Sequence, residues 1–162
     1  MKKQKGQTLI EALVALGVAV VVATAITIAA ISALKTTEFN SNANLASQYA
    51  QEGVEFARSI AQEDWGKFHT YQDDYCYNDN TTGLTSKGSN SCSLSKATSF
   101  ARVLTIDQTG GGQCNSSAYV LVTVSWRDGA CVNTNNDPLY NYFCHNVKVE
   151  TCLSSVNAVT LP

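Results

Sequence analysis

A long uncharged apolar segment near the N-terminus is the feature of this sequence that most restricts its fold. Residues 12–34 contain no charged side chain and no proline, and alanine, valine, leucine and isoleucine dominate them. At 1.5 Å per residue this segment would form a helix roughly 34 Å long, enough to cross a hydrocarbon core of about 30 Å. Thr24 and Thr27 can bond to carbonyl oxygens one turn back, so lipid tolerates them. The segment therefore predicts a helix that spans a membrane.

One acidic residue, Glu11, stands at the start of this segment. A carboxylate near the centre of a helix in lipid costs about 2.5–3.5 kcal/mol on insertion scales. Such a residue usually has a partner and a function. The alternative is that Glu11 lies at the membrane interface, where its carboxylate reaches water. We favour a functional role.

A short basic leader precedes the apolar segment. It contains Lys2, Lys3 and Lys5, ends at Gly6, and is followed by Gln7-Thr8-Leu9-Ile10-Glu11. This arrangement resembles the class III signal and N-terminal helix of type IV pilins and pseudopilins. An ordinary signal peptide is cleaved after its apolar region, not before it. The resemblance implies that a prepilin peptidase cuts between Gly6 and Gln7 and that Gln7 is N-methylated, although many family members have Phe at this position.

The resemblance also implies how the chain is used. The leader lysines would hold the N-terminus in the cytoplasm, so that a single-pass helix places the head outside it. The expected partners are the lipid bilayer, the prepilin peptidase, the pilus assembly platform and other pilin subunits, which pack through the N-terminal helix. In an extracellular filament, Glu11 would pair with the new amino group of a neighbouring subunit and fix the axial register. Both charges would be costly if buried unpaired.

The rival hypothesis is a membrane-anchored binding or adhesion module whose helix stays uncut. Removal of the three leader lysines lowers the formal net charge from −2 to −5, which argues against general capture of nucleic acid. The sequence has no Gly-x-Ser-x-Gly, phosphate-binding-loop or His-Glu-x-x-His motif. We therefore expect no catalytic residues, no cofactor and no enzymatic activity.

The pattern divides the chain into four regions: a leader at 1–6, an apolar transmembrane or filament-core helix at 7–34, an amphipathic helix half at 35–62, and a globular head at 63–162. In the amphipathic half, apolar residues recur at steps of three and four, as at Ala46, Tyr49, Gly53, Phe56 and Ile60. Within the head, residues 63–99 are expected to be mainly loop and residues 100–154 to form a sheet.

The expected fold is α+β and pilin-like, with the long helix covering a small antiparallel sheet of three to four strands. Residues 118–127 alternate most regularly, while residues 100–108 and 143–153 predict two further strands. Arg102 interrupts the apolar face of the first of these. The strand ending in Val-Ser-Trp-Arg-Asp-Gly also looks like the minor pilin subgroup often called PilV-like.

Six cysteines, all beyond residue 75, indicate disulfides in an exported head, and fifteen complete pairings are possible. If residues 118–127 and 143–153 form a hairpin, Cys131 and Cys144 flank its loop, while Cys114 and Cys152 lie at the opposite end. Cys76 and Cys92 remain, and we predict the nested set of disulfides Cys131–Cys144, Cys114–Cys152 and Cys76–Cys92. The rival is a zinc site, which the absence of any Cys-x-x-Cys pair disfavours. Cys144 and His145 are not expected to form a catalytic pair either, because adjacent strand residues point to opposite faces.

Two smaller patterns have a structural interpretation. Asp73, Asp74 and Asp79 lack the spacing of a calcium-binding loop. His69 falls in a loop, and His145 falls on an apolar strand face, where a satisfied core histidine is expected. No metal site is therefore predicted.

Overall fold

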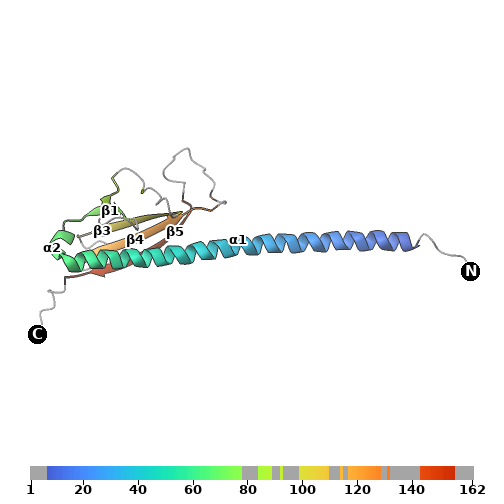
Figure 1. Cartoon of the computed structure of the whole chain (residues 1–162), viewed down its shortest axis with the longest axis horizontal. Helices are drawn as coiled ribbons and strands as arrows, with labels where there is room; N and C mark the ends of the chain where they lie inside the picture. The colour runs from blue at the N-terminus through green and yellow to red at the C-terminus, as the bar shows by residue number, and fades with distance from the viewer. Residues whose placement is uncertain are drawn as a thin grey trace, which may run out of the picture. The chain divides into compact units, whose positions relative to one another are not determined.

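The chain is described here from a computed structural model. The residues that it describes are 7–77, 84–88, 92, 99–109, 114, 117–128, 131 and 143–155. The chain separates into two compact units, Met1–Ser41 and Asn42–Pro162. Figure 1 labels the elements, which are α1 (Gln7–Glu63), α2 (Trp65–Phe68), β1 (Asp73–Cys76), β2 (Thr85–Ser86), β3 (Phe100–Asp107), β4 (Ala118–Trp126) and β5 (His145–Leu153).

Helix α1 is continuous from Gln7 to Glu63. Alanine and long aliphatic residues favour it throughout, and it contains no proline. It stops where Asp64 adopts an extended conformation and caps α2, its carboxylate accepting the N–H of Lys67 at 2.9 Å. The amphipathic pattern and the apolar segment thus form one helix, as predicted.

Five antiparallel strands form one sheet in the order β2-β1-β3-β4-β5. One row across the sheet shows the register: Tyr75 lies opposite Leu104, Leu104 opposite Val122, and Val122 opposite Val149. Along β4, buried and partly exposed residues alternate without interruption. The sheet therefore has one apolar face that needs cover.

The C-terminal part of α1 covers that face (Figure 1). Small side chains allow the close approach, because Ala46, Ala50 and Ala57 are completely buried. They pack with Leu104, Ile106, Val120, Val122, Val124 and Trp126 of the sheet. This α+β architecture is the pilin-like arrangement that the sequence predicts.

The number of strands differs from the three to four expected. The additional strands, β1 and β2, lie within residues 63–99, which were expected to be mainly loop. Strand β1 has only four residues, and β2 has two. Strand β1 pairs with β3, placing Asp73 opposite Ile106 and Cys76 opposite Val103, and β2 pairs with the other edge of β1. The pairing of β1 with β3 joins residues distant in sequence, and the local polar composition does not reveal it.

Arg102, which interrupts the apolar pattern of β3, points into the interior and is 2% exposed. Its guanidinium carbon lies 3.7 Å from the centre of the Tyr49 ring, and its Nη1 lies 3.6 Å from Glu52 Oε2. Both partners belong to α1. A cation over an aromatic face is attracted by the ring quadrupole. The arginine thus links helix and sheet instead of disrupting the sheet.

Three disulfides join Cys76 to Cys92, Cys114 to Cys152 and Cys131 to Cys144. These pairs coincide with the nested set expected from the hairpin of β4 and β5. Their Cα–Cα distances are 5.4, 5.6 and 5.5 Å, ordinary values for such bonds. Each bridge restricts the unfolded chain, which stabilises a small head by about 2–4 kcal/mol per bond.

Candidate functional site

The N-terminal candidate site begins at the boundary of the described residues. The expected cleavage point after Gly6 and the leader residues Lys2, Lys3 and Lys5 lie outside them. Gln7 is the first residue of α1, and its side chain is not described. Glu11 follows one helical turn later, and its side chain is exposed. Glu11 and Gln7, the residue expected to become the N-terminus after cleavage, therefore lie one turn apart on the same helix.

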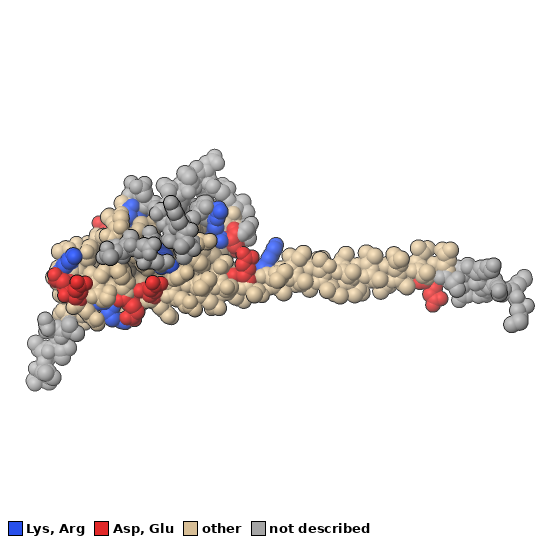
Figure 2. Space-filling model, in the orientation of Figure 1, with Lys and Arg blue, Asp and Glu red and all other residues tan. Residues whose placement is uncertain are grey.

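The first half of α1 exposes apolar side chains on every side. Exposed fractions are 64% for Leu13, 67% for Val21 and 68% for Ile28. Figure 2 shows one red acidic group near the N-terminal end of α1 and then a stretch of the helix without coloured acidic or basic atoms. A helix that is apolar all round belongs in lipid or in the interior of an assembly. By length and composition, α1 is suited to crossing a membrane.

The hydroxyl groups in this segment bond within the helix. Thr24 Oγ1 donates to the carbonyl of Val21 at 2.8 Å, and Thr27 Oγ1 donates to that of Ala23 at 2.9 Å. In hydrocarbon, where no water is available, an unpaired hydroxyl costs several kcal/mol, on the order of 4–8 on an alkane scale. These internal bonds keep the surface of the helix apolar.

The family comparison concerns this same segment. Residues 1–27 match the model of the prokaryotic N-terminal methylation motif. The N-terminus carries a type IV pilin-like class III signal. The methylation motif supports a pilin- or pseudopilin-like precursor that a prepilin peptidase processes. Neither a curated protein nor a solved structure matched the chain.

A polar cavity of about 600 Å³ lies along β1 and β3 and contains Asp73 and Asp74. Asp74 accepts hydrogen bonds from Thr105 Oγ1 at 2.6 Å and from Lys87 Nζ at 2.9 Å. Burial alone would raise the pKa of Asp74, but these bonds and the Lys87 charge outweigh it and lower the pKa. The carboxylate is thus occupied by protein donors. Asp79, the third acid of the pattern, lies outside the described residues.

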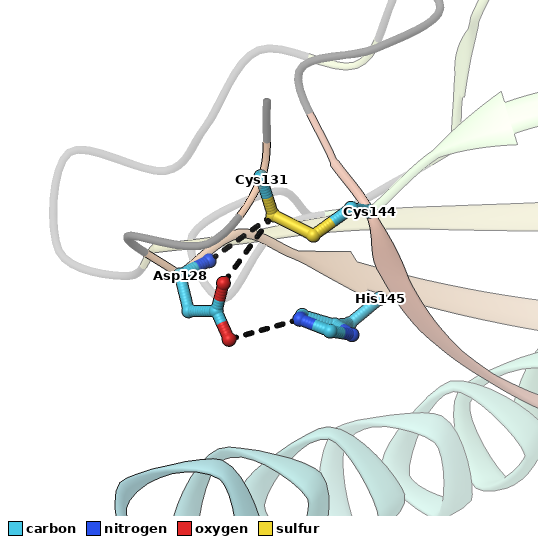
Figure 3. A group of neighbouring side chains, drawn as sticks. All are labelled: Asp128, Cys131, Cys144 and His145. Atoms are coloured by element: carbon cyan, nitrogen blue, oxygen red, sulfur yellow. Dashed lines mark hydrogen bonds and ion pairs between the residues drawn. A yellow bond between two sulfur atoms is a disulfide. The ribbon is translucent and has the colours of Figure 1, made fainter. Parts of the chain in front are cut away.

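A second cluster was missed by sequence reasoning. Asp128, Cys131, Cys144 and His145 bring one carboxylate, two sulfur atoms and one imidazole within 4.8 Å of one another (Figure 3). The expectation that Cys144 and His145 lie on opposite faces fails because Cys144 precedes β5, which begins at His145. His145 has a partner, as expected, because its Nε2 lies 2.9 Å from Asp128 Oδ2, but its side chain is 27% exposed and so lies at the edge of the core. Only the folded hairpin brings these residues together.

Proposed function

We propose that this chain is a structural subunit, a minor pilin or pseudopilin, of a type IV pilus-like filament. It is inserted in the cytoplasmic membrane by α1 with its head outside the cytoplasm. A prepilin peptidase cuts after Gly6, Gln7 is N-methylated, and the subunit then moves into an extracellular filament. The single observation that carries this proposal is the methylation motif at residues 1–27, which overlaps the apolar first half of the continuous helix α1.

The exposed apolar surface of α1 supplies the driving force for assembly. In the bilayer this surface contacts lipid, and outside the bilayer it must be buried against equivalent helices, because apolar burial contributes about 25 cal/mol per Å². Lys35 is the first charged residue after Glu11. The uncharged segment between these two charges therefore forms the core-packing surface.

Cleavage creates a positively charged partner for Glu11. The new α-amino group has an ordinary pKa of about 7.7–8.0 and is mostly protonated at neutral pH. A neighbouring subunit that places this group beside Glu11 pairs two charges that would each be costly in an apolar core. Only one axial shift between helices satisfies the pair, so Glu11 fixes the register.

Processing is tested by changing the residue before the cut. Gly6→Trp should block cleavage and leave a longer membrane form on an immunoblot, whereas Gln4→Leu, a matched change inside the leader, should be cut normally. Normal processing of Gly6→Trp would contradict the proposed cut. An uncut wild-type chain would instead support the anchored binding module.

Assembly is tested separately at Glu11. Glu11→Val should remain in the membrane and be processed, but should be lost from sheared filaments by about tenfold or more, since one unpaired α-amino group costs at least about 1.4 kcal/mol. Glu38→Val removes an acid from the same helix outside the apolar segment and should assemble normally. Equal incorporation of both variants would refute the register role.

A further inference from the structure

The cluster where the loop between β4 and β5 begins and ends has the composition of a metal site. We propose that Asp128, Cys131, Cys144 and His145 bind one zinc-type divalent ion when the Cys131–Cys144 disulfide is reduced. In the oxidised chain the disulfide occupies the two sulfur atoms. The disulfide and the metal are therefore alternative ways to close the same hairpin.

The donor set fits zinc in number and kind. Four-coordinate zinc takes thiolate sulfur, imidazole nitrogen and carboxylate oxygen, with metal–ligand distances of about 2.0–2.3 Å. Tetrahedral geometry then separates the ligand atoms by about 3.3–3.8 Å. All four donor atoms already lie within 4.8 Å of one another. Small side-chain movements suffice to surround an ion, and two soft sulfur ligands disfavour calcium or magnesium.

Neighbouring groups hold the donors in place. The His145 ring packs on Trp126, with centroids 5.4 Å apart, and its Nε2 lies 2.9 Å from Asp128 Oδ2. The Asp128 backbone N–H donates to Cys131 Sγ at 3.3 Å, a contact that would stabilise a thiolate. Asp128 Oδ1 lies 3.7 Å from the same sulfur. A bonded sulfur carries no proton, so this last contact is proximity and not a hydrogen bond.

Conversion between the two states requires a dithiol reductant. Its thiolate attacks one sulfur of the Cys131–Cys144 bond, and its second thiol resolves the mixed disulfide, so the reductant leaves as a disulfide. Two electrons and two protons pass to Cys131 and Cys144, which become thiols. Both thiols release their protons to solvent when the ion binds, which makes the affinity for metal rise with pH.

The bridge is accessible to such a reductant. Cys144 is exposed and Cys131 is half-buried, whereas each of the other two disulfides has one buried member, Cys92 or Cys114. Both side chains of the His145–Asp128 pair also retain some exposure, 27% and 23%. Solvent therefore reaches the donors, and a metal ion can enter.

A single substitution removes the Cys131–Cys144 disulfide and leaves the other two disulfides intact. Cys131→Ala in the full chain, kept in detergent without oxygen, leaves Cys144, His145 and Asp128 as three ligands. Added Co²⁺, a spectroscopic substitute for zinc, should give thiolate-to-cobalt charge-transfer absorption at one ion per chain. Cys131→Ala/Cys144→Ala should give none. Near-ultraviolet circular dichroism verifies that both variants fold, and Cys144→Ala, which leaves Cys131 as the thiol, provides a second test.

Further controls identify the remaining ligands. In the Cys131→Ala background, His145→Asn and Asp128→Asn should each weaken cobalt binding by about tenfold or more, the smallest loss expected for a direct ligand. Wild-type chain should bind cobalt with two thiolates only after mild reduction, with alkylation and mass spectrometry identifying the opened bridge. The proposal is overturned if folded Cys131→Ala and Cys144→Ala both give the spectrum of the double variant, or if His145→Asn binds as tightly as its parent.

Discussion

Arg102 shows how a single residue can break a sequence rule and still hold the fold together. It stands on the apolar face of β3 and is almost fully buried between the sheet and α1. Its carbon stem fills the interior, and its charge lies over the Tyr49 ring and near Glu52. The Glu52 side chain is 58% exposed, so the packing and the aromatic contact contribute more than the ion pair.

Three substitutions measure how much the packing of Arg102 and its ion pair with Glu52 each contribute to stability. Arg102→Ala should lower the free energy of unfolding by roughly 2–4 kcal/mol, because it leaves a cavity. Arg102→Met keeps most of the volume and should cost under about 1.5 kcal/mol, while Glu52→Gln should cost under about 1 kcal/mol. Thermal unfolding of the full chain in detergent, followed by near-ultraviolet circular dichroism, reports the order. A Glu52→Gln loss as large as that of Arg102→Ala would show that the ion pair dominates.

Asp74 makes the head sensitive to acid. Hydrogen bonds from Thr105 and Lys87 lower its pKa against the opposing effect of burial. A lowered folded-state pKa means that the ionised carboxylate stabilises the head above the unfolded pKa of about 3.9. That stability disappears as the pH falls through the folded-state pKa.

Asp74→Asn should therefore destabilise the head at pH 7 and matter progressively less below about pH 4. The effect should stay near or below about 1 kcal/mol, because the Asp74 side chain is 42% exposed and solvent screens it. Unfolding temperatures of both chains between pH 7 and pH 3 measure the difference. Lys87→Met should remove part of the same pH dependence. A difference in unfolding temperature between wild type and Asp74→Asn that grows as the pH falls would contradict the direction of the pKa shift.

At the scale of elements, the contact between α1 and the sheet depends on Gly53. A Cβ atom added there would lie 2.5 Å from Tyr77 Oη and 2.8 Å from Val122 Cγ1. Tyr77 cannot easily move, because it is buried and its hydroxyl donates to the Tyr49 carbonyl at 2.8 Å. The glycine therefore allows the helix to approach β4 closely.

Gly53→Ala should destabilise the head by about 1–3 kcal/mol through overpacking, although alanine favours a helix by about 1 kcal/mol. Gly17→Ala is the matched control, since a Cβ there meets no atom within 4 Å. The melting temperature of the head should fall by several degrees for the first variant and stay unchanged for the second. Equal melting temperatures for Gly53→Ala and wild type would show that the interface has room for a methyl group.

The elements differ in how far the sequence reveals them. The second half of α1 and strands β3, β4 and β5 follow from local periodicity, because each turns one stripe or one face of its own residues toward the core. The first half of α1 follows instead from its uninterrupted apolar composition. Strands β1 and β2 are too short and polar to show alternation. Strand β1 forms by pairing with β3, and β2 forms by pairing with β1. The cluster of Asp128 and His145 depends on where β4 ends and β5 begins, which periodicity locates only within a few residues. The leader is a linear motif and needs no fold to be recognised.

At the scale of the whole molecule, the N-terminal segment and the head have separate tasks. Residues 1–27 match the methylation motif, and the apolar half of α1 is long and apolar enough to cross a membrane. The head carries three disulfides and a sheet that its own helix covers. We expect substitutions where α1 packs on the sheet, such as Gly53→Ala, to change the stability of the head without changing the cleavage of the leader.

The central claim is that the chain loses its leader and enters a filament through the new N-terminus. Mass spectrometry of the N-terminal peptide from sheared, washed filaments tests it most directly. We expect the peptide to begin at Gln7 and to carry one methyl group on its amino nitrogen. A chain found only in the membrane fraction of cells that are producing filaments, with Met1 or Lys2 still at its N-terminus, would contradict the claim.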